Sequence, residues 1–317
     1  TKGCIKCPSC SIMNGFGGAG AFSDGKFNFT TEFGGWLNDY IPSRDVMDLI
    51  EYVDTVNVSF GATKERFSTY SPEAIRLERE ALHHDLHLLQ ASVKHLGTEK
   101  NLKILSNMAE DLEKKIDLIC NTTVEHIHKT LNGEYELDIK GGETICCKYL
   151  IVAPGRSGAE WFSSECKNMG INLINNQVDI GVRVELPAAV FEHITDVVYE
   201  AKLVYRTKLY GDQVRTFCMN PYGHVVMENV DGIITVNGHS YSDASLRSQN
   251  TNFALLVSNR FTQPFNEPYQ YGKRIASLSN LLGDGVMVQR FGDLVKGVRT
   301  NEHRLSKSFT KPTLNAT

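Results

Sequence analysis

A glycine-rich segment from Gly15 to Lys26, GFGGAGAFSDGK, combines glycine with Ser, Asp and Lys, residue types that suit an anionic cofactor. Because glycine has no Cβ, backbone amides in such a segment can approach a phosphate closely. We therefore predict a cofactor loop, with candidate contacts at Gly15, Gly17, Gly18, Gly20, Ser23, Asp24, Gly25 and Lys26. The spacing also spells G-x-G-x-x-G, but the strand and helix that this dinucleotide motif requires on either side are not expected here. A purely structural glycine loop is the alternative.

A cluster of three cysteines, Cys4, Cys7 and Cys10, has the spacing C-x2-C-x2-C. Three thiolates at this spacing can bind zinc or an iron–sulfur cluster, although both usually take four ligands and no fourth is evident. A redox dithiol beside a cofactor and an inert loop are the alternatives. The other cysteines are far apart, and several lie in apolar runs where Cys packs as a small hydrophobic residue.

The charge and composition of the chain indicate which kind of partner to expect. The 317 residues carry 33 Lys and Arg against 37 Asp and Glu, a net charge of -4. Because the two signs are interspersed, we expect no nucleic acid and no membrane surface as the main partner, and a small-molecule substrate instead. No apolar stretch reaches the roughly 20 residues of a membrane helix, no signal segment is seen, and the scattered cysteines favour a cytoplasmic protein. The first residue is Thr1, so we expect a piece cut from a longer protein.

Helix signals dominate residues 41–115. The run Ser71-Pro72-Glu73 is typical of a helix N-terminus, and the leucine spacing that follows predicts one long helix ending at Gly97. Thr98 then caps a second predicted helix. This region is therefore expected to be mainly helical.

Strand signals follow. Residues 116–120 predict a short strand, and alternating residues predict a hairpin that turns at Gly141-Gly142. The continuous apolar run from Tyr149 to Ala153 predicts a buried parallel strand, followed by a tight turn at Pro154-Gly155.

From residue 176 the pattern predicts a mixed, mostly antiparallel sheet of short strands separated by turn residues. The expected strands cover residues 178–184, 197–204, 214–219, 224–228 and 232–237. Residues 252–261 and 274–282 are expected to be helices, and 300–317 an irregular tail.

Five segments occur in a characteristic order: the cysteine cluster, GFGGAGAFSDGK, YLIVAPGRSGAEW, NQVDIGVRVELP and RTFCMNPYGHVV. Together they resemble the uncharacterised FAD-dependent dehydrogenases, bacterial and archaeal flavoproteins with two dinucleotide-binding domains, over essentially the whole chain. Members of this family are longer at both ends, with the true G-x-G-x-x-G unit upstream and another glycine-rich flavin loop downstream.

The resemblance implies an α/β fold with α+β elements, in which an incomplete Rossmann-like FAD-binding domain carries a helical insertion and a mixed, mostly antiparallel substrate domain. Residues 1–40 and 116–175 would belong to the FAD-binding domain and 41–115 to the helical region. Residues 176–299 would form the substrate domain, and 300–317 would return toward the FAD-binding domain.

The same resemblance implies where FAD would lie. The glycine loop would run along the cofactor, with Ser23 or Lys26 meeting its polar atoms. Val124 would be the strand position on the adenine side. The close turn beside the cofactor would comprise Ala153, Pro154, Gly155 and Arg156, of which Arg156 would either touch FAD or form a surface salt bridge.

The implied activity is hydride transfer through the flavin on an unknown small molecule, with NAD(P)H or a small metabolite as reductant. Arg183 is a candidate for clamping an anionic substrate, a chemistry that Arg206, Arg215 and Arg299 share. Cys218 is either a redox thiol or a packed strand residue, and His224 is a candidate proton donor. The alternatives are a cysteine-cluster protein for electron transfer or structure, and a binding module without catalysis.

Overall fold

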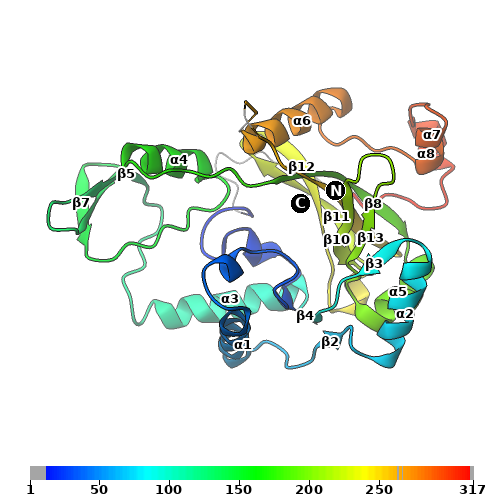
Figure 1. The fold of residues 1–317 in the computed structure, drawn as a ribbon, viewed down its shortest axis with the longest axis horizontal. Helices are drawn as coiled ribbons and strands as arrows, with labels where there is room; N and C mark the ends of the chain where they lie inside the picture. Colours follow the sequence, from blue (N-terminus) through cyan, green and yellow to red (C-terminus); the bar gives the residue numbers. More distant parts are fainter. Residues whose placement is uncertain (1–11, 263, 266, 315–317) are drawn as a thin grey trace.

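The computed structural model describes residues 12–262, 264–265 and 267–314. Its largest unit is a five-stranded sheet in the order β3-β9-β10-β13-β8, with antiparallel pairing throughout (Figure 1). In that order the strands span Leu86–Leu88, Leu203–Arg206, Gln213–Asn220, Asn250–Asn259 and Val178–Pro187. Strands β13 and β8 pair along their whole length, from Asn250 opposite Pro187 to Asn259 opposite Val178, so they fix the register of the sheet.

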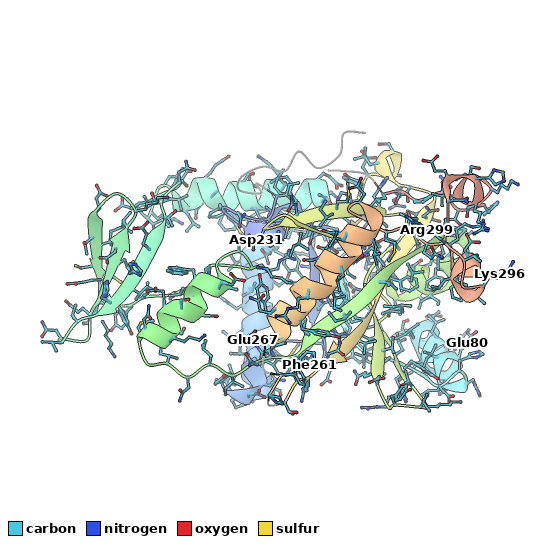
Figure 2. All side chains as sticks on the ribbon, turned by 90° about the horizontal axis from the view of Figure 1, so that it is seen from above. Glu80, Asp231, Phe261, Glu267, Lys296 and Arg299 are labelled. Carbon is cyan, nitrogen blue, oxygen red and sulfur yellow. The ribbon has the colours of Figure 1, made fainter. Side chains whose placement is uncertain are left out.

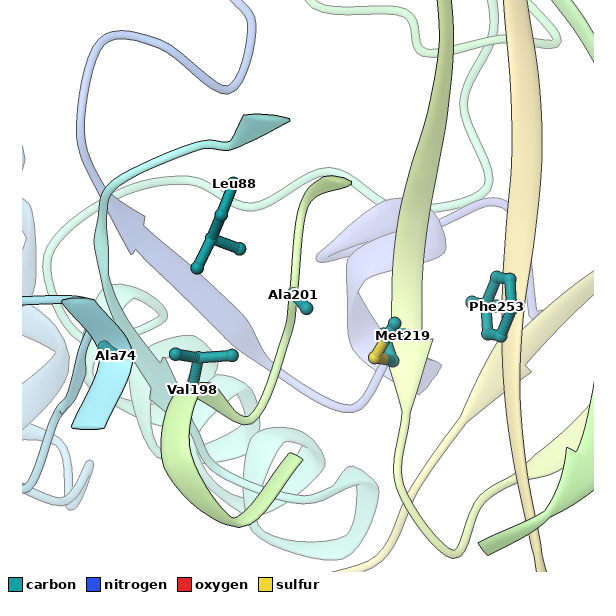
Figure 3. Packing of buried hydrophobic residues seen from close by; sticks show 6 residues of the cluster. All are labelled: Ala74, Leu88, Val198, Ala201, Met219 and Phe253. Carbon is teal, nitrogen blue, oxygen red and sulfur yellow. The ribbon is translucent and has the colours of Figure 1, made fainter. Parts of the chain in front are cut away.

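Two helices, α2 (Pro72–His83) and α5 (Ala188–Val198), pack against this sheet. The main hydrophobic core forms between them and the strands, from Ala74, Leu88, Val198, Ala201, Met219 and Phe253 (Figure 3). The Phe253 ring stacks on the Phe191 ring of α5, with centroids 5.3 Å apart. Burial of these apolar side chains is the main attraction that holds the helices on the sheet.

A separate hairpin of β11 (His224–Val230) and β12 (Ile233–His239) contacts β10 and β13, and helix α6 (Pro268–Gly283) packs against β12 (Figure 1). The short helix η3 (Ala244–Leu246) links β12 to β13. Helices α7 (Phe291–Val295) and α8 (Glu302–Ser306) follow α6. Figure 2 shows that Lys296 and Arg299, beside α7, lie at the end of the molecule remote from the green sheet β5–β7.

The N-terminal part contains a three-stranded antiparallel sheet in the order β1-β4-β2, spanning Lys26–Phe29, Ser92–His95 and Phe67–Ser68. Helices α1 (Ser43–Ser59) and α3 (Thr98–Leu112) flank it around a second core of Ala62, Leu96 and Ile104. The short helix η1 (Gly18–Phe22) precedes β1 and contacts α3, and η2 (Leu37–Asp39) precedes α1.

A third antiparallel sheet, in the order β5-β6-β7, lies at the left of Figure 1 and consists of Val124–Lys129, Tyr135–Ile139 and Glu143–Cys147. Helix α4 (Ala159–Asn168) is attached to β5 by three polar contacts, one of them between Glu165 and His126 Nδ1 at 3.2 Å. The Trp161 Nε1 donates to the Glu125 carbonyl at 2.8 Å, and the Ile127 amide donates to the Glu165 carboxylate at 2.8 Å. None of the described helices is long and apolar enough to span a membrane.

The expected combination of helices with mostly antiparallel sheet is confirmed. The predicted helix start at Ser71 is confirmed in detail, because the Ser71 hydroxyl accepts the Ala74 amide at 3.1 Å. The predicted hairpin turn is confirmed too, since Gly141 and Gly142 have φ values of 115° and 93° that suit glycine.

Four expectations before residue 160 were wrong. Thr98 is the first residue of α3 and not its cap, since Gly97 holds the cap position without a side-chain hydrogen bond. The helix that starts at Pro72 ends at His83 and not at Gly97, because the chain turns through a positive φ of 58° at Asp85 into β3. Residues 116–120 form no strand. The run from Tyr149 to Ala153 is not a buried parallel strand, since Ile151 is 93% exposed and no parallel pairing occurs between described residues. An apolar run becomes a buried strand only when neighbouring strands pair with it.

Three expectations in the second half were also wrong. Residues 300–317, expected as an irregular tail, contain helix α8. Residues 252–261, expected as a helix, belong mostly to strand β13, and residues 197–204 contain the end of α5 and the start of β9. In both cases a short apolar run fits helix and strand equally well by periodicity. The tertiary position decides, because β13 is buried between β10 and β8 and pairs with both.

The position of the core predicts that alanine substitutions at two phenylalanines change the free energy of unfolding by very different amounts. Replacing Phe253, 6% exposed, by Ala removes a ring packed on Phe191, and we expect a loss of about 3–5 kcal/mol in the free energy of unfolding. Replacing Phe309, 93% exposed, by Ala is the matched control and should change it by less than about 0.5 kcal/mol. Urea denaturation followed by circular dichroism measures both, and equal effects would contradict this description of the core.

Candidate functional site

The glycine loop begins as an open surface. Gly15, Gly17 and Gly18 have φ values of 91°, 77° and 52°, a left-handed conformation that favours glycine. A Cβ added at Gly15, Gly18 or Gly20 would meet nothing within 4 Å, whereas one at Gly17 would press on Leu105 of α3. One side of the loop is therefore packed, and its other side leaves the backbone open to a ligand.

The end of the loop turns into the interior. Asn101 of α3 fixes it by donating from Nδ2 to the carbonyls of Gly20, at 2.5 Å, and Ser23, at 3.2 Å. A Cβ on Gly25 would come within 3.1 Å of Asn101 and 3.0 Å of Leu96, so glycine is required for packing there. Ser23 bonds locally, since its hydroxyl donates to the Gly20 carbonyl and accepts the Gly25 amide.

The second predicted cofactor segment lies against the start of this loop. The Ser157 hydroxyl donates to the Asn14 Oδ1 at 2.5 Å, and Arg156 Nη2 lies 3.7 Å from the Met13 sulfur, contacts that cross 143 residues of sequence. Gly155 has a φ of 67°, and Arg156 also forms an ion pair with Glu228 of β11 at 3.3 Å. Two glycine turns that are distant in sequence thus form one surface, with the Arg156 guanidinium at its edge.

Lys26, at the end of the loop, is a buried cation whose side chain is 7% exposed. Five groups surround its Nζ: the Met219 carbonyl at 2.6 Å, Asn220 Oδ1 at 3.3 Å, Asp24 at 3.4 Å, Glu200 at 3.5 Å and Cys218 Sγ at 3.7 Å. Burial acts to lower the pKa of the ammonium, but Asp24, Cys218 and Glu200 outweigh it and raise the pKa above its usual value. Lys26 is therefore a permanent charge that ties the loop to β10.

A chain of hydrogen-bonding groups extends from Asp24. The Ser240 hydroxyl lies 3.2 Å from Asp24 Oδ2, 3.0 Å from His95 Nε2 and 2.9 Å from the Tyr199 hydroxyl. Burial raises the pKa of Asp24, and Lys26 only partly offsets it. Burial, with the nearby Lys26 charge, lowers the pKa of His95 to about 3, so this imidazole is neutral at physiological pH. We call Asp24, Lys26, His95, Tyr199, Glu200, Cys218 and Ser240 the Lys26 cluster.

The structure brings the predicted residues Cys218 and Arg183 together. Cys218 has a φ of 48° at an irregularity in the pairing of β10 with β13, and its sulfur lies 3.8 Å from Asn237 Oδ1. Arg183 Nη1 donates to the Cys218 carbonyl at 3.2 Å and to Asn252 Oδ1 at 2.6 Å. The Arg183 guanidinium thus supports the bent backbone of Cys218, and its buried Nε has no partner among the described residues.

Two other predicted residues lie apart from the Lys26 cluster. His224 pairs with His239 across the β11–β12 hairpin and approaches the Leu246 carbonyl at 2.9 Å from Nε2. No hydrogen bond between described residues joins His224 to Cys218 or Arg183. Val124 is the first residue of β5, in the separate three-stranded sheet, opposite Ile139. Their assigned roles stay predictions.

The predicted metal ligands Cys4, Cys7 and Cys10 lie outside the described residues. Within the described part of the chain, no group of three or more His, Cys, Asp or Glu side chains is placed to hold a metal ion. The cysteines that are described are free thiols: Cys120, Cys146, Cys147, Cys166 and Cys218.

Sequence reasoning missed most of the Lys26 cluster. His95, Tyr199, Glu200 and Ser240 come from distant segments, and no spacing relates them to the glycine loop. It also missed Lys202, 3% exposed, whose ammonium lies 4.0 Å from the Phe33 ring centroid and 4.7 Å from that of Phe217. Burial lowers the pKa of Lys202 to about 8. The charged residues Glu200 and Lys202, in a segment expected to be a strand, were the available signal.

Comparison with known proteins gives distant similarities, and no family model matches the chain. An uncharacterized protein of Clostridium beijerinckii is 25% identical over 318 residues, covering 95% of this chain and 52% of that protein. This chain therefore spans about half the length of the curated relative. A crystal structure of glycine oxidase from Geobacillus kaustophilus is similar over 89% of this chain and 85% of its own, with 14% identity and a TM-score of 0.33.

The buried imidazole predicts a specific pH dependence. The pKa of His95 is about 3 in the fold against 6.5 for the ordinary group, so below about pH 6.5 the unfolded chain binds a proton that the fold excludes. Stability should fall as the pH drops from about 6.5 toward 3. His95→Gln should reduce this slope by up to about 1.4 kcal/mol per pH unit. Urea unfolding from pH 7 down to 4 measures it.

His303→Gln, at an exposed position, is the matched control and should leave the pH slope unchanged. An unchanged slope in His95→Gln would show that the imidazole titrates normally in the fold.

Proposed function

We propose that this chain is part of a flavin-dependent oxidoreductase, and that FAD lies on the surface formed by the open side of the Gly15–Gly20 loop and the Gly155–Ser157 turn. The observation that carries the proposal is the open backbone at Gly15, Gly18 and Gly20, beside a second glycine turn held by the Asn14–Ser157 hydrogen bond. Two such turns side by side offer a ligand several backbone positions that carry no Cβ atom.

The residues present fit such a cofactor. A Cβ at Gly18 or Gly20 would project into the space that a flat or extended ligand would use. Arg156, at the edge of this surface, is half exposed and carries the cation that a diphosphate needs. When bound, a flavin supplies acceptance and donation of hydride at its ring.

The protein's own groups then set the position and charge of this surface. Lys26 and Asn101 fix the conformation of the loop through hydrogen bonds to the protein, so its open side is already formed before a ligand binds. Arg183 is engaged with Cys218 and Asn252, which supports a positioning role for it over a substrate clamp. Cys218 is half-buried, and its sulfur lies 3.7 Å from the Lys26 Nζ.

The first test is the visible absorption spectrum, recorded for this chain and for a version extended at both ends with native sequence to the length of its relative. We expect two flavin bands in the extended form, and FAD released by acid. A thiolate-to-iron shoulder would make Cys4, Cys7 and Cys10 the functional centre, and a colourless extended protein would support a binding module without catalysis. Cys7→Ser should leave the flavin content unchanged.

Substitution at Gly20 tests the placement. Gly20 has open space at its Cβ and no positive φ, so Gly20→Phe covers the proposed surface without straining the backbone. We expect the ratio of flavin to protein in the extended form to fall at least about tenfold. Gly292→Phe, which also has open space and lies in α7, is the matched control and should keep its flavin. Full flavin content in Gly20→Phe would place the cofactor elsewhere.

A further inference from the structure

A cavity of about 310 Å³ lies between helix α1 and strand β1, outside the Lys26 cluster. Its volume is at the lower end of the roughly 300–1,000 Å³ that small-molecule pockets occupy. The walls are mainly apolar. Leu37, Leu49 and Val53 line it although they are 46%, 47% and 52% exposed, so the cavity opens to solvent beside these three side chains.

Two uncharged polar side chains line the cavity without a hydrogen-bond partner among the described residues: Asn28 of β1, whose Oδ1 is buried, and Asn57 of α1. Asn57 is 8% exposed and lines the cavity, and its carboxamide makes no hydrogen bond to any described residue. Its backbone carbonyl alone is used, by the amides of Phe60 and Ala62. Val46, Ile50, Val53 and Asn57 recur at helical spacing, so the carboxamide lies on the face of α1 that lines the cavity. The Asn57 carboxamide is not fully enclosed, so water in the open cavity reaches it, and a ligand with a matching group takes the place of that water.

The charge in the wall is already neutralised. Asp54 lies 2.5 Å from the Lys94 ammonium and 2.7 Å from the Arg66 guanidinium. Burial would raise the pKa of Asp54, but the hydrogen bonds from Lys94 and Arg66 outweigh it and hold the pKa below its usual range. The carboxylate stays charged and paired. A cationic ligand therefore finds its counter-ion engaged, and an anionic ligand meets a carboxylate in an apolar wall.

The geometry points to a binding site for a small neutral molecule with an apolar body and one N–H or O–H group, seated between α1 and β1 and hydrogen-bonded to Asn57. The apolar body fills the space between Phe27 and the leucine and valine side chains of α1, and the polar group meets the carboxamide. This inference does not rest on the flavin proposal, because the cavity shares no lining residue with the Gly15–Gly20 loop.

Indole and indene test the site as a matched pair of probes. The two have nearly the same shape, but only indole carries an N–H, so wild-type protein should bind indole more tightly. Asn57→Leu keeps the volume and removes the unpaired amide, so this variant should fold. We expect it to bind indole roughly fivefold to tenfold more weakly and indene about as well as wild type does. Ligand-observed NMR titration measures both affinities.

A second variant tests the location. Val53→Phe replaces a small aliphatic side chain at the cavity wall by an aromatic ring that takes up part of the cavity, so indole binding should be lost. Val190→Phe, on α5, is the matched control, because the two valines are 52% and 54% exposed, and it should bind like wild type. Circular dichroism checks that each variant folds.

Three results would overturn the inference: no saturable binding of indole to the wild-type protein, equal affinity for indole and indene, or unchanged indole binding in a folded Val53→Phe. Flavin content, measured on the same samples, should be the same in all of them. A loss of flavin without a change in indole binding would bear on the cofactor proposal alone.

Discussion

Burial of the Lys26 ammonium is the constraint on which the arrangement of the N-terminal part and the main sheet depends. An ammonium removed from water is tolerated only where carbonyls and carboxylates replace its hydration. Here Asp24 is a local partner, but the other groups are distant in sequence, and the contacts to Cys218, Met219 and Asn220 span 192, 193 and 194 residues. The glycine loop and strand β10 are therefore held together by a charge that neither of them can solvate alone.

Two residues near the Lys26 ammonium have an unusual backbone conformation. Cys218 and Tyr199 have φ values of 48° and 52°, which ordinary side chains rarely adopt. The bend at Cys218 interrupts the pairing of β10 with β13, and the Met219 carbonyl next to it accepts from Lys26. Tyr199 stacks on His95 with ring centroids 4.4 Å apart, which closes the cluster on the side of β4. Each of the two bends is followed by a residue that contacts the Lys26 ammonium, Met219 after Cys218 and Glu200 after Tyr199.

Local signals in the sequence predicted local structure, and long-range structure escaped them. The turn at Gly141-Gly142 and the helix start at Ser71 depend on neighbouring residues only, and both were predicted correctly. Strand β13 was taken for a helix because its apolar run has no helical or strand period of its own, and pairing on both sides decides its conformation. The Lys26 cluster escaped for the same reason. Its acids, imidazole and hydroxyls become a site only through the contacts of loops that are distant in sequence.

Strand β1 shows why this arrangement tolerates no shift in pairing. Alternate residues of a strand face opposite sides, and Lys26 is opposite His95 while Phe27 is opposite Lys94. One face therefore carries Lys26 into its cluster, and the other carries Phe27 and Lys94 toward α1, where Lys94 is bound by Asp54. Both lysine side chains are almost fully buried, at 7% and 0% exposure. A slip of one residue in either strand would turn its lysine to the wrong face and separate it from its carboxylate, Asp24 or Asp54, so two buried ion pairs on opposite faces favour one register of a sheet only a few residues long.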